Sequence, residues 1–136
     1  MASWSMDYNI DVDEDNSVVF VKIYGQWTTE TAENYHRDFR EELEPLLGRP
    51  WAKMVDLTNW KTSRDEVTGV IGKHMAWSQS NDISLSLYVI NNTSTFRQLN
   101  EMFAKGKTTN VSHTFRTQGE ADKFLKEHWM GKQHTI

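Results

Sequence analysis

The sequence predicts a single α/β domain with a mostly parallel sheet. Its 136 residues are enough for one domain with one hydrophobic core. Along the chain, apolar residues recur alternately with the period of a strand and with the period of a helix. Near the start, two apolar runs are separated only by a short polar turn, which indicates a hairpin. The predicted order is ββαβαβαβα, with one antiparallel edge strand and flanking helices.

The hairpin strands are predicted at 8–14 and 17–25. The first alternates apolar and polar residues, as a half-exposed strand does, and the second is an almost continuous apolar run typical of a buried strand. A helix is expected over 28–47, because its apolar residues recur at three- and four-residue spacing. Thr28 or Thr29 is its predicted N-cap, and Gly48 and Pro50 are its predicted stop signals.

Three strand–helix pairs follow, at 51–57 and 63–80, 83–90 and 91–106, and 112–116 and 117–130. The strand over 83–90 is the clearest, with one face predicted to carry Ile83, Leu85, Leu87 and Val89. The helix over 63–80 is less regular because it contains two glycines. The predicted domain is 1–136 with a core at about 7–130, and the ends at 1–6 and 131–136 are expected to be short and flexible.

Composition excludes several classes of function. The net charge is -4 and the pI about 5.7, which argues against a nucleic-acid binder that needs a basic face. The absence of cysteine excludes disulfides, thiolate catalysis and cysteine-based metal sites. The five histidines have no metal-ligand spacing, and the sequence has no motif for a cofactor. No metal or cofactor is therefore expected. Because the sequence has no apolar stretch long enough to span a membrane and no signal-peptide pattern, a cytoplasmic protein is expected.

A ligand site in such a sheet is expected at the carboxyl ends of the parallel strands. The loops that meet there are predicted at 25–27, 56–63, 91–93 and 116–117. They and the adjoining helix start supply the candidate binding residues Trp27, Asp56, Asn59, Trp60, Ser63, Arg64, Glu66, Asn91 and Asn92.

Most of these residues have a structural and a functional interpretation. Ser63 and Glu66 fit the capping box of a helix, a device that Thr117 and Glu120 repeat. A phosphate on Ser63, at a helix N-terminus, is the alternative. Asp56 is interpreted as a structural residue, or as a catalytic acid or Mg²⁺ ligand without a visible partner. The tryptophans cover the ends of the core or line an apolar groove.

Four stretches resemble the SpoIIAA-like proteins, small bacterial relatives of the STAS domain of anti-sigma factor antagonists: VVFVKIYGQWTTETAENYHRDF, WAKMVDLTNW, LSLYVINNT and FRTQGEADKFL. The resemblance covers roughly residues 8–129 and implies the same fold. In those antagonists the loop after the strand that corresponds to 51–57 carries the motif Asp-Ser-Ser-Gly, in which one serine is phosphorylated. By spacing that motif falls on 65–68, where only Asp65 matches, so the resemblance does not carry the phosphorylation switch to this chain. Glu66, at a serine position, could mimic a permanent negative charge.

The leading functional hypothesis is a non-enzymatic protein-interaction or regulatory module. Its contact surface is predicted over 56–67, with Trp27 and Asn91–Asn92 beside it. A homodimer is a further possibility, since an aromatic-rich small domain has apolar surface to cover.

Two alternatives remain open. The resemblance extends to Sec14-type lipid-binding domains, which implies a carrier that holds a small apolar or lipid-like ligand between the sheet and a helix. An enzyme would need at least two convergent polar groups in one pocket, for which the candidates are Asp56, Asn59, His74 and Asn91.

Overall fold

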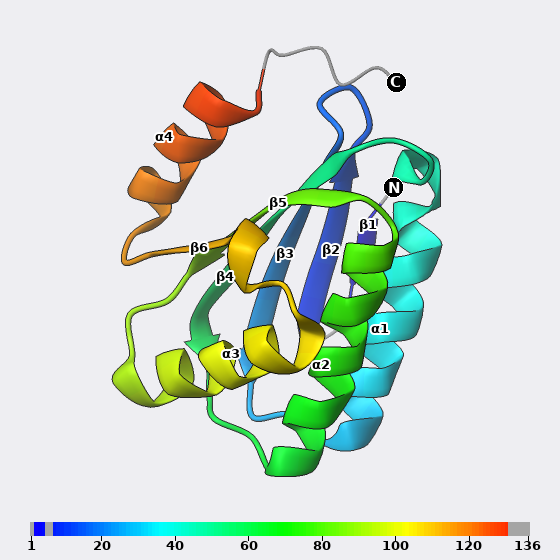
Figure 1. Ribbon diagram of the computed structural model, residues 1–136. Helices are drawn as coiled ribbons and strands as arrows, with labels where there is room; N and C mark the ends of the chain where they lie inside the picture. The colour runs from blue at the N-terminus through cyan, green and yellow to red at the C-terminus, as the bar shows by residue number, and fades with distance from the viewer. Residues whose placement is uncertain (1, 5–6, 131–136) are drawn as a thin grey trace.

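The computed structural model describes residues 2–4 and 7–130 (Figure 1). Six strands form one sheet, and their order across it, β1-β2-β3-β4-β5-β6, is also their order along the chain. The strands are β1 (Ala2–Trp4), β2 (Tyr8–Asp13), β3 (Val18–Gly25), β4 (Trp51–Trp60), β5 (Ile83–Val89) and β6 (Ser112–Phe115). The α-helices are α1 (Thr29–Leu43), α2 (Asp65–Ser80), α3 (Thr93–Gly106) and α4 (Gln118–His128). The predicted α/β fold is confirmed.

Strands β1 to β3 form the antiparallel side of the sheet, because β1 pairs with β2 and β2 with β3. The hairpin of β2 and β3 is as predicted. The prediction that residues 1–6 are a loose end is wrong for Ala2–Trp4, which pair with Asn9–Asp11. The rest of the predicted flexible ends, residues 1, 5, 6 and 131–136, lies outside the described residues.

Strands β3 to β6 run parallel, and each pairs with its neighbour in sequence. Right-handed crossovers that all step in the same direction place their helices on the same face of a sheet. Helices α1, α2 and α3 accordingly pack over one face. The apolar side chains buried between these three helices and strands β2 to β5 are here called the helix-side core. Helix α4 lies apart from them (Figure 1) and covers Val18, Met54 and Leu87 on the opposite face. In the described part of the chain, no helix is long and apolar enough to cross a bilayer.

Among the described residues, three helices begin with a side-chain cap, and capping residues were expected at the start of each of them. Thr28 accepts a hydrogen bond from the backbone N–H of Thr31 at 3.2 Å, and Thr117 accepts one from that of Glu120 at 3.2 Å. Asn92 caps α3 in the same way. Each cap satisfies a backbone donor that lacks a partner inside its helix, which stabilises the helix by about 1 kcal/mol.

Two irregularities in β4 and β5 change which side chains share a face. Between the pairs Lys22–Asp56 and Tyr24–Asn59, β4 holds one residue more than β3, and the strand runs on to Trp60 instead of ending at residue 57 as predicted. The extra residue places Trp60 in the helix-side core. A second shift, next to Trp51, turns Ile83 toward the same core, so that only Leu85, Leu87 and Val89 keep the predicted common face.

Helices α2 and α3 approach each other closely at two glycines. A Cβ atom on Gly106 would lie 2.9 Å from the carbonyl oxygen of Gly72, and one on Gly72 would lie 2.7 Å from Cβ of Lys105. Real Cβ atoms do not make contacts this short. Gly72, which from sequence only weakens the helix, therefore allows the two helices to pack.

We expect Gly106→Ala to lower the free energy of unfolding by about 1–3 kcal/mol, because the added methyl group overpacks the contact with α2. Gly69→Ala is the matched control, since a Cβ there has nothing within 4 Å. It should raise the stability by about 0.5–1 kcal/mol, because it replaces a helical glycine. Urea unfolding of both variants measures the two changes. Equal effects of the same sign would contradict the packing argument.

Candidate functional site

A cavity of about 30 Å³, here called the central cavity, lies in the helix-side core between the sheet and helices α1 to α3. Most of its lining is apolar and comes from Ile23, Trp27, Val55, Leu57, Trp60, Val67, Ile71, Met75, Leu99 and Met102. Four further residues of the lining carry a polar group on their side chains, Tyr35, Lys53, His74 and Tyr88. Two residues of the whole lining, Trp27 and Trp60, were among the binding residues predicted at the carboxyl ends of the strands.

Lys53 lies in the middle of β4 and is only 2% exposed. Its Nζ lies 5.6 Å from the ring centroid of Phe39 and 5.5 Å from that of Tyr88. Within the described part of the chain, no carboxylate forms an ion pair with it. An ammonium buried in this way costs several kcal/mol, whereas each ring contact returns roughly 1–2 kcal/mol. The core therefore contains a cation without a counter-ion among the described residues.

His74, on α2, is 1% exposed and lines the same cavity. Its Nδ1 lies 2.8 Å from Nδ1 of His36, while its buried Nε2 has no hydrogen-bond partner among the residues that the structure describes. Burial lowers the pKa of His74 well below the ordinary histidine value, and the charge of Lys53 lowers it further. Burial also lowers the pKa of His36, with a contribution from Arg40. His74 is therefore a neutral imidazole at neutral pH, with a single N–H to donate.

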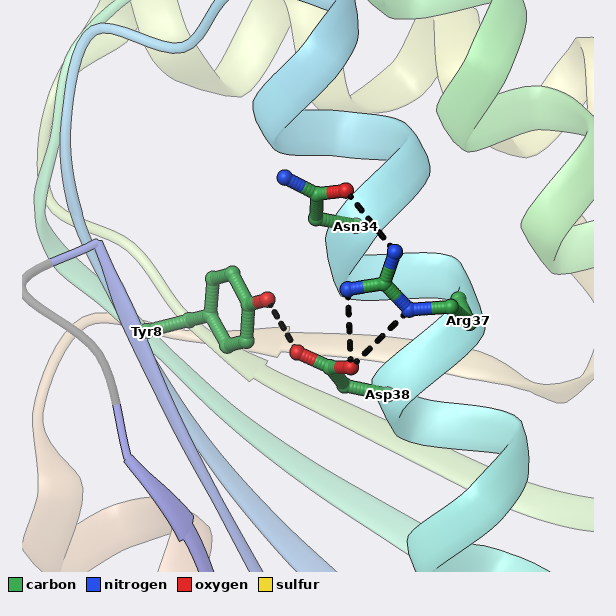
Figure 2. Close-up of polar contacts among 4 residues, drawn as sticks. All are labelled: Tyr8, Asn34, Arg37 and Asp38. Carbon is green, nitrogen blue, oxygen red and sulfur yellow. Dashed lines mark hydrogen bonds and ion pairs between the residues drawn. The ribbon is translucent and has the colours of Figure 1, made fainter.

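Trp27 and Tyr35, two aromatic residues of the cavity lining, form a cluster with the ring of Tyr8. The centroid of Trp27 lies 5.7 Å from that of Tyr8 and 5.2 Å from that of Tyr35. Figure 2 shows how Tyr8 is tied to α1: its hydroxyl donates to Oδ2 of Asp38 at 2.5 Å, and Arg37 contacts the other carboxylate oxygen at 3.3 Å. Burial, and then this hydrogen bond to Asp38, raises the pKa of Tyr8. The ring cluster is thus fixed on both β2 and α1.

An open groove of about 600 Å³, the Trp27 groove, lies at the carboxyl edge of the sheet next to this cluster. Its lining consists of Gln26, Trp27, Thr28, Thr29, Arg64, Glu66 and Val67. Trp27 and Val67 line both this groove and the central cavity. These two side chains therefore stand between the cavity and solvent.

A second groove of about 420 Å³, the Phe96 groove, lies between the ends of β5 and β6 and the start of α3. It includes Asn91 and Asn92, together with Phe96 and Arg116. Phe96 is 40% exposed, and among the described residues only Leu47, at 38%, is another exposed large apolar side chain. The predicted single contact surface is therefore divided: Arg64 and Glu66 lie with Trp27 in one groove, and Asn91 and Asn92 lie in another.

The predicted capping box at Ser63 is wrong. Helix α2 begins at Asp65, its N-cap is Arg64, and that residue makes no side-chain capping bond. Ser63 Oγ instead accepts the N–H of Trp27 at 3.1 Å, and the backbone of Ser63 exchanges two hydrogen bonds with the side chain of Gln98, at 2.8 and 2.6 Å. Ser63 ties its loop to β3 and α3, through partners 35 or 36 residues away that a local pattern does not contain.

Asp56 and Asn59 line neither the cavity nor the grooves. Oδ1 of Asp56 accepts the N–H of Thr58 at 2.9 Å and the hydroxyl of Thr58 at 2.7 Å, at the irregularity in β4. Nowhere among the described residues do three His, Asp or Glu side chains gather as metal ligands would. The structural interpretation of Asp56 fits these contacts.

Sequence reasoning missed Lys53 altogether and named His74 only as a candidate for the enzyme alternative. One signal was present for Lys53: a lysine stands in the middle of the apolar run WAKMV, in a strand predicted for the parallel part of the sheet. For the free Nε2 of His74 no sequence signal exists, because it depends on how α1 and α2 pack.

We expect Asp56→Ala to lower the free energy of unfolding by about 1 kcal/mol, because the N–H and hydroxyl of Thr58 lose their acceptor. Asp56→Asn keeps an oxygen at this position and should lose less. Urea unfolding with and without millimolar Mg²⁺ tests the alternative role. A rise in stability with Mg²⁺ that depends on Asp56 would contradict the structural interpretation, since a bound ion stabilises the folded state.

Stability should fall as the pH is lowered through about 6.5. His74 and His36 have a lower pKa in the folded protein than in the unfolded chain, so the unfolded chain takes up protons first and gains stability. Each group contributes a slope of at most roughly 1.4 kcal/mol per pH unit, and the half-buried His36 contributes less. Urea unfolding between about pH 7.5 and 5.5 measures the slope.

The slope should be smaller in His74→Phe. His113→Gln, which removes an exposed histidine of β6, is the control and should behave as the wild type. An unchanged slope in His74→Phe would contradict the assignment to the histidine pair.

The comparisons with known proteins concern the fold. No family model matches the chain, and no curated protein matches it. Among solved structures, it is similar to an uncharacterised protein of the DUF3478 family with a SpoIIAA-like fold from Shewanella loihica PV-4. The TM-score is 0.66 at 14% identity, and the match covers 92% of this chain and 98% of that one. The SpoIIAA-like fold expected from the sequence is therefore confirmed.

Proposed function

We propose that this chain is a non-enzymatic binding domain that takes a small apolar ligand into the central cavity. The observation that carries the proposal is that two neighbouring spaces have lining residues in common. An apolar cavity inside the core and an open groove at the edge of the sheet share the side chains of Trp27 and Val67. Ligand sites are typically mostly apolar pockets with a few polar groups, as this cavity is.

Binding requires some movement of side chains. A cavity of about 30 Å³ has room for only about two water molecules. Met75 and Met102 are its most adaptable walls, because methionine is unbranched and fills spaces of varied shape. Trp27 lies just beyond the end of β3, where a small shift would join the cavity to the groove.

The four candidates named from the sequence for an enzyme do not share a pocket. Asp56 and Asn59 lie outside the cavity and the grooves, and Asn91 lies in the Phe96 groove, away from His74 in the central cavity. That particular set of polar groups is therefore not convergent, which favours the binding domain over the enzyme that the sequence offered.

The interaction or regulatory module is the second candidate, and the Phe96 groove favours it. A large exposed apolar side chain beside Asn91, Asn92 and Arg116 is typical of a protein contact with a polar rim. Both candidates use the same edge of the sheet.

Native mass spectrometry of the protein, purified gently from its own host, tests the proposal. We expect a bound small mass that leaves on denaturation. Val67→Phe places a larger side chain between the groove and the cavity, so this variant should no longer carry the bound mass. Glu66→Phe is the matched control, because Glu66 lines the groove but not the cavity, and should retain the mass.

A bound polypeptide without a small ligand would support the interaction module instead. The proposal would be overturned if the protein carries no bound small mass and its tryptophan fluorescence does not change when apolar compounds are added. Thermal unfolding of both variants checks that they are folded.

A further inference from the structure

We infer that the ligand of the central cavity carries a single carboxylate on an apolar chain, with Lys53 as its counter-ion and His74 Nε2 as a second hydrogen-bond donor. This inference rests on the proposed function and names the chemical class of its ligand. Two independent observations support it, both in residues that line one cavity: a buried lysine without a counter-ion and a buried imidazole nitrogen without a hydrogen-bond partner among the described residues.

The first observation concerns the charge of Lys53. Its Nζ is positioned by the rings of Phe39 and Tyr88, and neither ring neutralises it. A buried ammonium is stable only when an anion and hydrogen bonds replace its water shell. Because the described chain offers no carboxylate there, the anion is expected to come from the ligand.

The second observation concerns the hydrogen bonds of His74. If Nδ1–H of His36 donates to Nδ1 of His74, the single proton of the neutral His74 ring is on Nε2. In that tautomer the Nε2–H is buried and finds no acceptor in the described part of the chain. A carboxylate has two oxygens, so it can accept one bond from Lys53 and one from His74.

The charge balance selects the class of anion. The cavity lining contains one cation, because His74 is neutral. A monoanion cancels that charge, whereas a phosphate monoester carries about -1.5 to -2 and would leave a buried negative charge. A cationic ligand would be repelled, and a neutral alcohol would leave Lys53 unpaired.

The remaining lining determines the rest of the ligand. Beyond the polar groups, the walls are aliphatic, methionine and tryptophan side chains, which match an apolar chain. The way out of the cavity runs past Trp27 and Val67 to the Trp27 groove. The carboxylate is therefore innermost and the apolar chain points toward the groove.

Calorimetric titration of the full chain with octanoate and with octan-1-ol tests the inference. The two probes have the same chain length and differ only in the head group. We expect octanoate to bind at least tenfold more tightly, as charge-assisted hydrogen bonds predict. Lys53→Met should lower the affinity for octanoate at least tenfold and leave that for octan-1-ol within about twofold. Lys73→Met, an exposed lysine next to His74 in sequence, is the control and should keep the preference.

Each outcome separates this inference from the proposed function. If octan-1-ol binds as tightly as octanoate, or if Lys53→Met keeps the preference, the carboxylate assignment is wrong and the apolar site stands. If neither probe binds, the proposed function fails, and the inference fails with it. The comparison of the two probes on the wild type needs no variant, so it decides even if Lys53→Met does not fold.

Discussion

The sequential order of the strands is the constraint on which the rest of this structure depends. Because each parallel strand lies beside the one before it, three crossovers of the same hand place α1, α2 and α3 on one face. Of the described helices, only α4 covers the opposite face. The same order places the carboxyl ends of β3 to β6 along one edge, so that both grooves open there.

That arrangement buries β4 on both faces and makes Lys53 the costliest residue of the core. Its neighbours across the sheet are β3 and β5, and helices cover its side chain, so that only 2% of the residue is exposed. Replacing such a charge by an apolar residue of similar volume often stabilises a protein. A buried lysine without an ion pair among the described residues therefore points to function rather than to stability.

The sequence predicted the elements of this fold well because their signals are local. The spacing of apolar residues gave α1 and its buried stripe, and Thr28 and Thr117 were recognised as caps from their neighbours alone. The site was harder to predict because it depends on contacts between distant segments. The carboxyl-edge rule found Trp27 and Trp60, but the bulge that turns Trp60 inward comes from the pairing of β4 with β3. Ser63 was misread as a cap for the same reason.

The hydrogen bonds of Ser63 link the two candidate functions. Its Oγ accepts from the backbone of Trp27, which lines the cavity, and its backbone is bonded to Gln98 on α3, two residues from Phe96. A ligand that displaces Trp27 acts on the first of these bonds, and through the loop on the position of α3. Contacts alone do not make a signal, since a ligand shifts an equilibrium only by its difference in affinity for two states. Binding in the central cavity would alter the Phe96 groove only if the ligand favours one arrangement of Trp27 over another. In that case a single movement of Trp27 would serve both candidate functions, the binding of a ligand and the regulation of a protein contact.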